Sequence, residues 1–304
     1  MSAEQIEGRG ASGDGFCPSP DEGELRDRLR EARAHAEGDP GEGLSLVASL
    51  CHELAWDLLE EGLLSDAEAL VREELAAVRF LAANDPETFL PRVADACENL
   101  AGILWEGGDP AEAEPLYREA LSLRRSLAGQ DPAEGPLSEV ASSCVDLALF
   151  LEDLGRLEEA EPLLREALGT YRSLRGGHAL SWAAMVARTG FVLARVLDCA
   201  GRPEEAEPLL REALGCYRSL AAADPGEDGL PALIPEAGSP MGALATILAE
   251  GGRVGEAEEL FREGLSMYAI LSEAHPERED FRLGEEAFRD GLAQLSDTTI
   301  THAS

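Results

Sequence analysis

The sequence predicts an all-α protein, a solenoid of about five helical hairpins with a helical cap at each end. A pattern of Leu, Ala and Gly occurs five times, with turn glycines spaced by 46, 47, 46 and 51 residues. A period of this length is typical of stacked helical hairpins. On both sides of each glycine, apolar residues recur at offsets of three and four, as on one face of a helix. The turn glycines are Gly62, Gly108, Gly155, Gly201 and Gly252.

The first helix of each hairpin ends at the turn glycine, where a positive φ is common. Eight residues before the glycine stands Leu, Ala follows it, and four before the glycine stands Leu again. These residues share one stripe, which we expect to be buried. The stripe consists of Leu54, Ala55 and Leu58; Leu100, Ala101 and Leu104; Leu147, Ala148 and Leu151; Leu193, Ala194 and Leu197; Leu244, Ala245 and Leu248.

The second helix follows the glycine and has its own stripe. Ala stands five residues after the glycine, and Leu stands eight, thirteen and nineteen after it. Two helices approach closely only where one side chain is small, and neighbouring bulky side chains fill the groove between them. The small positions are Ala67, Ala113, Ala160, Ala206 and Ala257, and the first Leu positions are Leu70, Leu116, Leu163, Leu209 and Leu260.

This pattern resembles the tetratricopeptide repeat in all five copies. The motif Glu-Ala-Glu-Pro-Leu at 112–116, 159–163 and 205–209 is similar to the kinesin-light-chain type of repeat, which has many bacterial relatives. The resemblance implies a right-handed superhelix whose first helices line a concave face. Asn99 is the one position that keeps the Asn of kinesin-light-chain repeats before the Leu-Ala pair, and the absence of Lys excludes the usual carboxylate clamp for chaperone C-termini.

The same alignment predicts the boundaries of the domains. Residues 1–21, rich in Gly, Ser and charge, are expected to be a disordered tail, and residues 22–296 form the solenoid. Residues 297–304 are expected to be a C-terminal tail. Within the solenoid we expect a half repeat at 22–38, repeats at about 39–84, 85–130, 131–177, 178–223 and 224–274, and a capping helix at 277–296.

The connection between the fourth and fifth repeats contains an insertion at 221–238. Ser239 and Pro240 resemble an N-cap and the first helical residue, so the fifth first-helix is expected to be short, about Pro240 to Glu250. The insertion has two interpretations: part of a binding face, or tolerated drift, because a longer loop costs little.

The amino-acid composition indicates which classes of partner to expect. The formal net charge is −35, and all 25 basic residues are Arg. A nucleic-acid-binding protein needs a basic face, so we expect no nucleic-acid partner. The acidic charge indicates either a basic partner or carboxylates that stabilise the starts of the second helices. The sequence has no run of 18 apolar residues, so we expect a cytoplasmic protein without membrane contact.

No motif indicates catalysis, a metal or a cofactor. His52 and Glu53 begin like a zinc-protease motif, but Trp56 stands where the second His is required. The five His are scattered along the sequence, and no Gly-rich phosphate loop or nucleophile motif is present. We therefore expect no enzyme, no metal site and no cofactor.

Apart from Asn99, which the kinesin-light-chain resemblance adds, the candidate binding residues lie on what we call the first-helix face, the positions thirteen, ten, six and three before each turn glycine. Trp56 and Trp105 are expected to be exposed aromatics, and Val145, Leu149 and Phe191 are expected to form an apolar strip beside two Arg. Aromatic residues and Arg are typical hot spots. The alternative is that these residues pack against a neighbouring helix. The candidates are His52, Trp56, Glu98, Asn99, Trp105, Val145, Leu149, Arg188, Phe191 and Arg195.

The leading functional hypothesis is a non-catalytic scaffold or adaptor that holds a peptide or helix of another protein in its groove. The alternative is a regulatory sensor that binds a small peptide or metabolite and changes its superhelical curvature. An enzyme is the third hypothesis.

Overall fold

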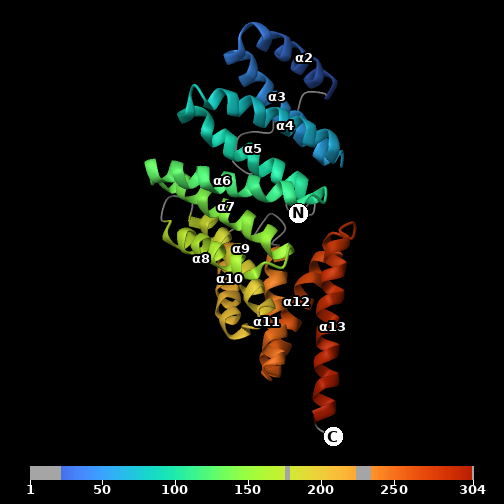
Figure 1. Cartoon of the computed structure of the whole chain (residues 1–304). Helices are drawn as coiled ribbons and strands as arrows, with labels where there is room; N and C mark the ends of the chain where they lie inside the picture. The colour runs from blue at the N-terminus through green and yellow to red at the C-terminus, as the bar shows by residue number, and fades with distance from the viewer. Residues whose placement is uncertain (1–21, 175–178, 224–233, 303–304) are drawn as a thin grey trace. The chain divides into compact units, whose positions relative to one another are not determined.

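The computed structural model describes residues 22–174, 179–223 and 234–302, and this part of the chain is all α-helical (Figure 1). The expected tail at 1–21 and the centre of the insertion, 224–233, lie outside the described residues. The helices are α2 (Glu22–Gly38), α3 (Pro40–Glu60), α4 (Leu64–Ala82), α5 (Pro86–Glu106), α6 (Pro110–Gln130), α7 (Glu134–Asp153), α8 (Leu157–Ser173), α9 (Ala179–Cys199), α10 (Pro203–Ala223), α11 (Ile234–Glu250), α12 (Val254–Ala274) and α13 (Glu279–His302).

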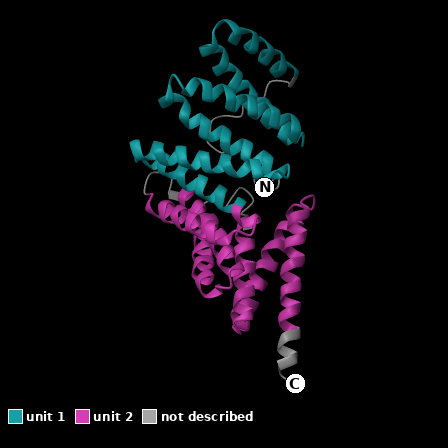
Figure 2. Cartoon of the chain, viewed as in Figure 1, with its two compact units in different colours: residues 1–150 teal, residues 151–304 magenta. Residues whose placement is uncertain are grey.

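The chain divides into two compact units, residues 1–150 and 151–304 (Figure 2). In unit 1 each helix from α2 to α6 packs on the next one along the chain. In unit 2 the helices from α8 to α13 pack in the same sequential way, and α13 also contacts α11. This sequential packing confirms an all-α solenoid of helical hairpins.

Each hairpin turn is built on its glycine. The five predicted turn glycines are the described residues with positive φ, with values from 71° at Gly155 to 83° at Gly108. The residue after the glycine donates its N–H to the carbonyl of the Leu four before the glycine, as Arg202 does to Leu197 at 2.9 Å. This is the Schellman ending of a helix, which needs a left-handed residue.

Several helices have Asp as the N-cap and Pro as the first helical residue. The carboxylates of Asp85 and Asp109 accept hydrogen bonds from the N–H groups of Thr88 and Glu112 at 3.3 and 3.2 Å. Asp39 caps α3 in the same way. The capping carboxylate satisfies a free N–H, and the proline that follows needs no partner for its nitrogen. The three Asp-Pro pairs therefore mark the starts of α3, α5 and α6.

The predicted stripe of the first helices is buried in every copy. In the second helices the Ala positions are buried, but the Leu eight after the glycine is half-buried in four copies. The residue one further along is buried instead, and this is an addition to the predicted core. That position holds Val71, Tyr117, Leu164, Leu210 and Phe261.

The prediction for the fifth first-helix is wrong at its start. α11 begins at Ile234, so Pro240 lies inside the helix and Ser239 is not its N-cap. Pro235 stands in the first turn, where a missing N–H costs nothing. The start is fixed by Tyr268, whose hydroxyl donates to the carbonyl of Pro235 at 3.1 Å. At the other end, α13 continues to His302, so most of the expected tail at 297–304 is helical.

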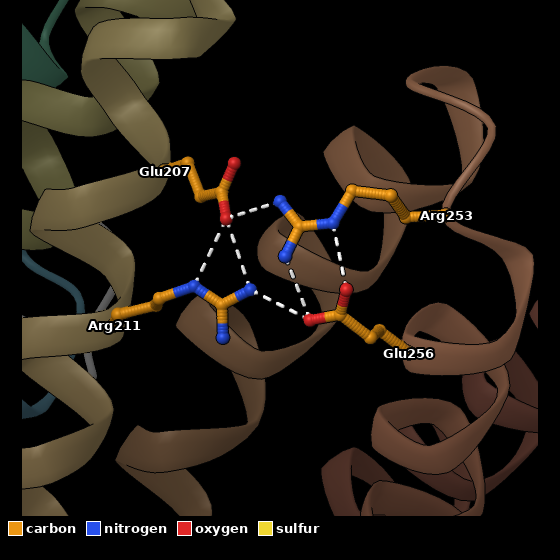
Figure 3. A network of polar contacts seen from close by, with 4 residues as sticks. All are labelled: Glu207, Arg211, Arg253 and Glu256. Carbon is orange, nitrogen blue, oxygen red and sulfur yellow. Dashed lines mark hydrogen bonds and ion pairs between the residues drawn. The ribbon is translucent and has the colours of Figure 1, made fainter.

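Arg–Glu pairs connect the second helices of successive repeats. Arg72 contacts Glu68 in its own helix and Glu112 one repeat later. In the network of Figure 3, Arg253 donates to Glu207 at 2.6 Å and to Glu256 at 2.7 Å, and Arg211 bridges the same two carboxylates. Bridging two carboxylates suits the planar, forked guanidinium better than the ammonium of Lys. These Arg side chains therefore link the second helices of neighbouring repeats at the solvent-exposed surface.

One stretch, Leu180–Cys199 of α9, is long and apolar enough to cross a membrane by length and composition alone. Half of it is buried, and α9 packs against α8 and α10. Its apolar character is therefore explained by the hairpin core.

Candidate functional site

The ten candidate residues fall in both units and are not equivalent. Unit 1 holds His52, Trp56, Glu98, Asn99, Trp105, Val145 and Leu149, and unit 2 holds Arg188, Phe191 and Arg195. In unit 1 the structure brings Trp56, Glu98 and Asn99 together around one recess. The other residues either support this recess, belong to the core, or lie in unit 2.

The recess, which we call the Trp56 pocket, opens between α3 and α5. Its wall is almost entirely apolar, and the volume inside it is about 40 Å³. An engineered cavity that binds benzene is about 150 Å³, so the Trp56 pocket has room for the tip of one aliphatic side chain. It is lined by Ala55, Trp56 and Leu59 of α3, by Glu98, Asn99, Gly102, Ile103 and Glu106 of α5, and by Val71 and Tyr117 of the second helices.

Gly102 is the residue that keeps the pocket open. A Cβ at this position would meet only the Tyr117 hydroxyl, at 3.7 Å, which is an ordinary contact. A side chain at residue 102 therefore has space to occupy. At the same position of the repeat, six before the turn glycine, the other copies carry Trp56, Leu149, Arg195 and Thr246.

Trp56 is half-buried, not fully exposed as predicted, and a chain of polar contacts fixes its ring. Its Nε1 donates to Nε2 of His52 at 3.1 Å. Nδ1 of His52 lies 3.3 Å from Oε1 of Glu74 on α4. The hydrogen bond that His52 donates to Glu74 raises the pKa of His52, and partial burial opposes this rise. Accepting from Trp56 requires a neutral His52 with its proton on Nδ1.

Glu74 was not among the predicted residues, although the sequence contains a signal for it. Twelve residues after the turn glycine, the other repeats carry Ala120, Ala167, Ala213 and Gly264. Only the first repeat has a carboxylate there, and its side chain is 4% exposed. Oε2 of Glu74 accepts no hydrogen bond from the described residues. The first repeat therefore differs from the others by a buried acid at a position where they have Ala or Gly. A buried polar group of this kind needs a structural or functional explanation.

Glu98 is buried, with a side chain 9% exposed, so it is not the open groove residue that the sequence predicted. The hydroxyl of Ser143 donates to its Oε1, and Nη2 of Arg124 lies 3.6 Å from its Oε2. Arg124 also contacts Asp95 and Glu139. The buried carboxylate is thus held by α6 and α7 and supports the wall of the pocket.

Three other candidate residues of unit 1 are less exposed than the sequence predicted. Trp105 is half-buried because its ring packs edge-on against Phe150, with centroids 5.8 Å apart. Val145 and Leu149, expected to form an exposed apolar strip, are 7% and 8% exposed and belong to the core. The alternative interpretation, packing within the solenoid, is correct for these side chains, because an aliphatic side chain gains free energy when neighbours cover it.

In unit 2 the candidates Phe191 and Arg195 contact each other and a carboxylate of the same unit. Arg195, 46% exposed, lies over the ring of Phe191 at 5.8 Å and donates to Glu152 at 2.7 Å. The hydrogen bonds that Arg195 donates to Glu152 raise the pKa of Arg195. Arg188 is half-buried, near Tyr217. The predicted Arg hot spot is therefore already neutralised by a carboxylate of the same unit.

No metal site accompanies these residues. Among the described residues, no group of three or more His, Cys, Asp or Glu could hold a metal ion.

Sequential hairpins with glycine turns define a tandem α-helical repeat protein. Three family models described as tetratricopeptide repeat match residues 93–134, 139–219 and 239–263. The chain is a tetratricopeptide repeat protein. Repeats of this family are generally non-catalytic and mediate contacts between proteins.

Solved structures of the same fold include kinesin-light-chain-like proteins. BtubC (BKLC) from P. vanneervenii is 22% identical, with a TM-score of 0.63 over 83% of this chain and 91% of that one. TPR-like repeats of kinesin-light-chain type from Podosopora anserina are 21% identical, with a TM-score of 0.54 over 75% and 97%. A Rap protein complexed with competence and sporulation factor is 15% identical, with a TM-score of 0.54 over 94% and 77%. No curated protein matches the chain in sequence.

Proposed function

We propose that the protein is a non-catalytic adaptor that binds a peptide or helix of another protein on the first-helix face of unit 1. One observation carries the proposal: the Trp56 pocket is an apolar recess on the face that the family pattern assigns to ligands. An aromatic wall and a recess sized for one side chain are typical of a hot spot in a protein interface.

The cytoplasm is the proposed location. The described cysteines Cys51, Cys97, Cys199 and Cys216 are free thiols. Free thiols suit a reducing compartment.

A second candidate function is a sensor for a short peptide. It is favoured by the similarity in fold to a Rap protein complexed with a peptide factor.

An affinity pull-down from the native lysate tests the adaptor function. Wild type is compared with a variant carrying Trp56→Ala, Phe191→Ala and Arg195→Ala, and captured proteins are identified by mass spectrometry. The matched control carries Phe80→Ala, Ile270→Ala and Arg262→Ala, which remove two exposed apolar side chains and one Arg from the second helices.

A protein captured by wild type and by the control, but lost with the first variant, supports the adaptor function and names the partner. Equal capture by all three proteins would contradict it. Binding of a short synthetic peptide, followed by a change in the small-angle scattering of the protein, would instead support the sensor.

A further inference from the structure

The charged groups of the Trp56 pocket all have the same sign. Among the ten lining residues the ionised side chains are Glu98 and Glu106, and no basic side chain lines the pocket. Burial raises the pKa of Glu106, because its charged form is poorly solvated. A cation placed beside this carboxylate would therefore be stabilised more than one in open solvent.

A third carboxylate lies behind the pocket wall. Glu74 is buried beneath the His52–Trp56 pair, and its Oε2 accepts no hydrogen bond from the described residues. α3 ends in exposed Glu60 and Glu61, directly after the lining residue Leu59. Arg124 pairs with Glu98, so the excess negative charge comes from Glu106, Glu60 and Glu61, and it has the sign of the whole chain, whose formal net charge is −35. A field of this sign steers basic partners to the surface and repels acidic ones.

The interior of the pocket sets a second requirement. The wall is apolar and the volume is about 40 Å³. This space fits the tip of a Val, Leu or Ile side chain. Asn99 adds an amide to the wall, which can pair with the backbone of an extended or helical segment.

We propose that the Trp56 pocket binds a basic segment of a partner protein, inserting one aliphatic side chain while a neighbouring Arg or Lys meets Glu106. This inference rests on the adaptor function and specifies the chemistry of its partner. It also assigns the acidic charge of the chain to partner selection, one of the two interpretations that the composition left open.

The probe is a phage-displayed library of random 12-residue peptides, selected on the immobilised full-length protein at low salt. Enriched peptides are synthesised, and their affinities are measured by fluorescence anisotropy. We expect the enriched sequences to share an aliphatic residue next to Arg or Lys. Enrichment of acidic peptides would overturn the inference.

Two pocket variants test the contact itself. Gly102→Leu fills the recess from a position with free space, so the helix is kept, and we expect about a tenfold loss of peptide affinity. Gly169→Leu on α8 is the control, because residue 169 is a helical glycine outside the pocket, exposed and with nothing near its Cβ position. Glu106→Gln should weaken binding about threefold at low salt and less at high salt, while Glu273→Gln on α12 removes one exposed charge without this loss.

The outcomes separate this inference from the adaptor function. Peptides that bind wild type but are insensitive to Gly102→Leu and Glu106→Gln would overturn the pocket inference and leave the adaptor function standing. A selection without enriched peptides would also overturn it, and the pull-down would still decide the adaptor function.

Discussion

The first-helix faces of the two units use one repeat position in opposite ways. Six residues before the turn glycine, unit 1 has Gly102, which leaves a recess beside Trp56. Unit 2 has Arg195, which covers Phe191 and pairs with Glu152. The hairpins are built on the same buried stripe, so the difference comes from residues outside the repeated pattern. In this protein the repeats define the scaffold, and the exceptions define the candidate site.

The largest expected effect on the free energy of unfolding comes from the ion pairs of the two units. Arg124→Ala in unit 1 leaves the buried Glu98 without its cation, and we expect it to lower the free energy of unfolding by about 3 kcal/mol or more. Arg195→Ala in unit 2 removes a half-exposed pair, and its cost should be below about 1 kcal/mol. Urea unfolding at pH 7 measures both values. Equal costs would mean that the two faces do not differ in burial as described.

Truncation of the apolar side chains sharpens the same comparison. Leu149 is buried in the core of unit 1, so Leu149→Ala should cost about 2–4 kcal/mol. Phe191 is only half-buried in unit 2, so Phe191→Ala should cost less than Leu149→Ala although it removes more atoms. Thermal unfolding of the two variants measures this order. The reverse order would contradict the burial of Leu149 in the core and would favour the predicted exposed position.

Protonation of His52 is expected to alter the wall of the Trp56 pocket. Its surroundings are Glu74 on α4 and Asp95 and Arg92 on α5, and the hydrogen bond that it donates to Glu74 raises its pKa. The pair with Glu74 therefore stabilises the fold below the unfolded pKa of about 6.5. This stabilisation is lost as the pH rises through the higher folded pKa. Protonation also puts a hydrogen on Nε2, which then no longer accepts from Trp56.

Tryptophan fluorescence measures this coupling. With Trp105→Phe and Trp182→Phe, Trp56 is the only tryptophan left, and its emission should titrate with an apparent pKa above 6.5. Adding Glu74→Gln should move the titration to lower pH, while Glu273→Gln should not. An emission that is constant between pH 5 and 8 would show that His52 does not hold the ring.

The smallest effect on stability is expected for variants of the exposed network of Figure 3. Hydrogen bonds from Arg253 and then Arg211 lower the pKa of Glu256 to about 2. Its contribution to stability is present above the unfolded pKa of about 4.3 and is lost as the pH falls through the folded pKa. Arg253→Lys should raise the pKa of Glu256 in an NMR titration, with little change in Tm at pH 7. A large drop in Tm would contradict the assignment of this network to the solvated surface.

The repeated residues made the fold predictable from the sequence. Gly62 and its equivalents adopt positive φ, and the Leu-Ala-Leu stripe is buried in each copy. The site was predictable only in part, because the helical offsets identify a face but not what covers it. Trp56 and Asn99 line the recess, whereas Val145 and Leu149 are covered within unit 1. Glu74 could have been identified as a carboxylate at a small-residue position, but its contact with His52 depends on the packing of α4 against α3.

The central claim is that the partner binds on the first-helix face of unit 1. Its most direct test is a pull-down with separate variants of unit 1 and unit 2. Trp56→Ala alone and the pair Phe191→Ala with Arg195→Ala are compared with wild type for the same captured protein, after circular dichroism has shown that all are folded. The account predicts that Trp56→Ala lowers capture about tenfold or more and that the unit 2 pair leaves it nearly unchanged. Loss of the partner with the unit 2 pair, and full capture with Trp56→Ala, would contradict it.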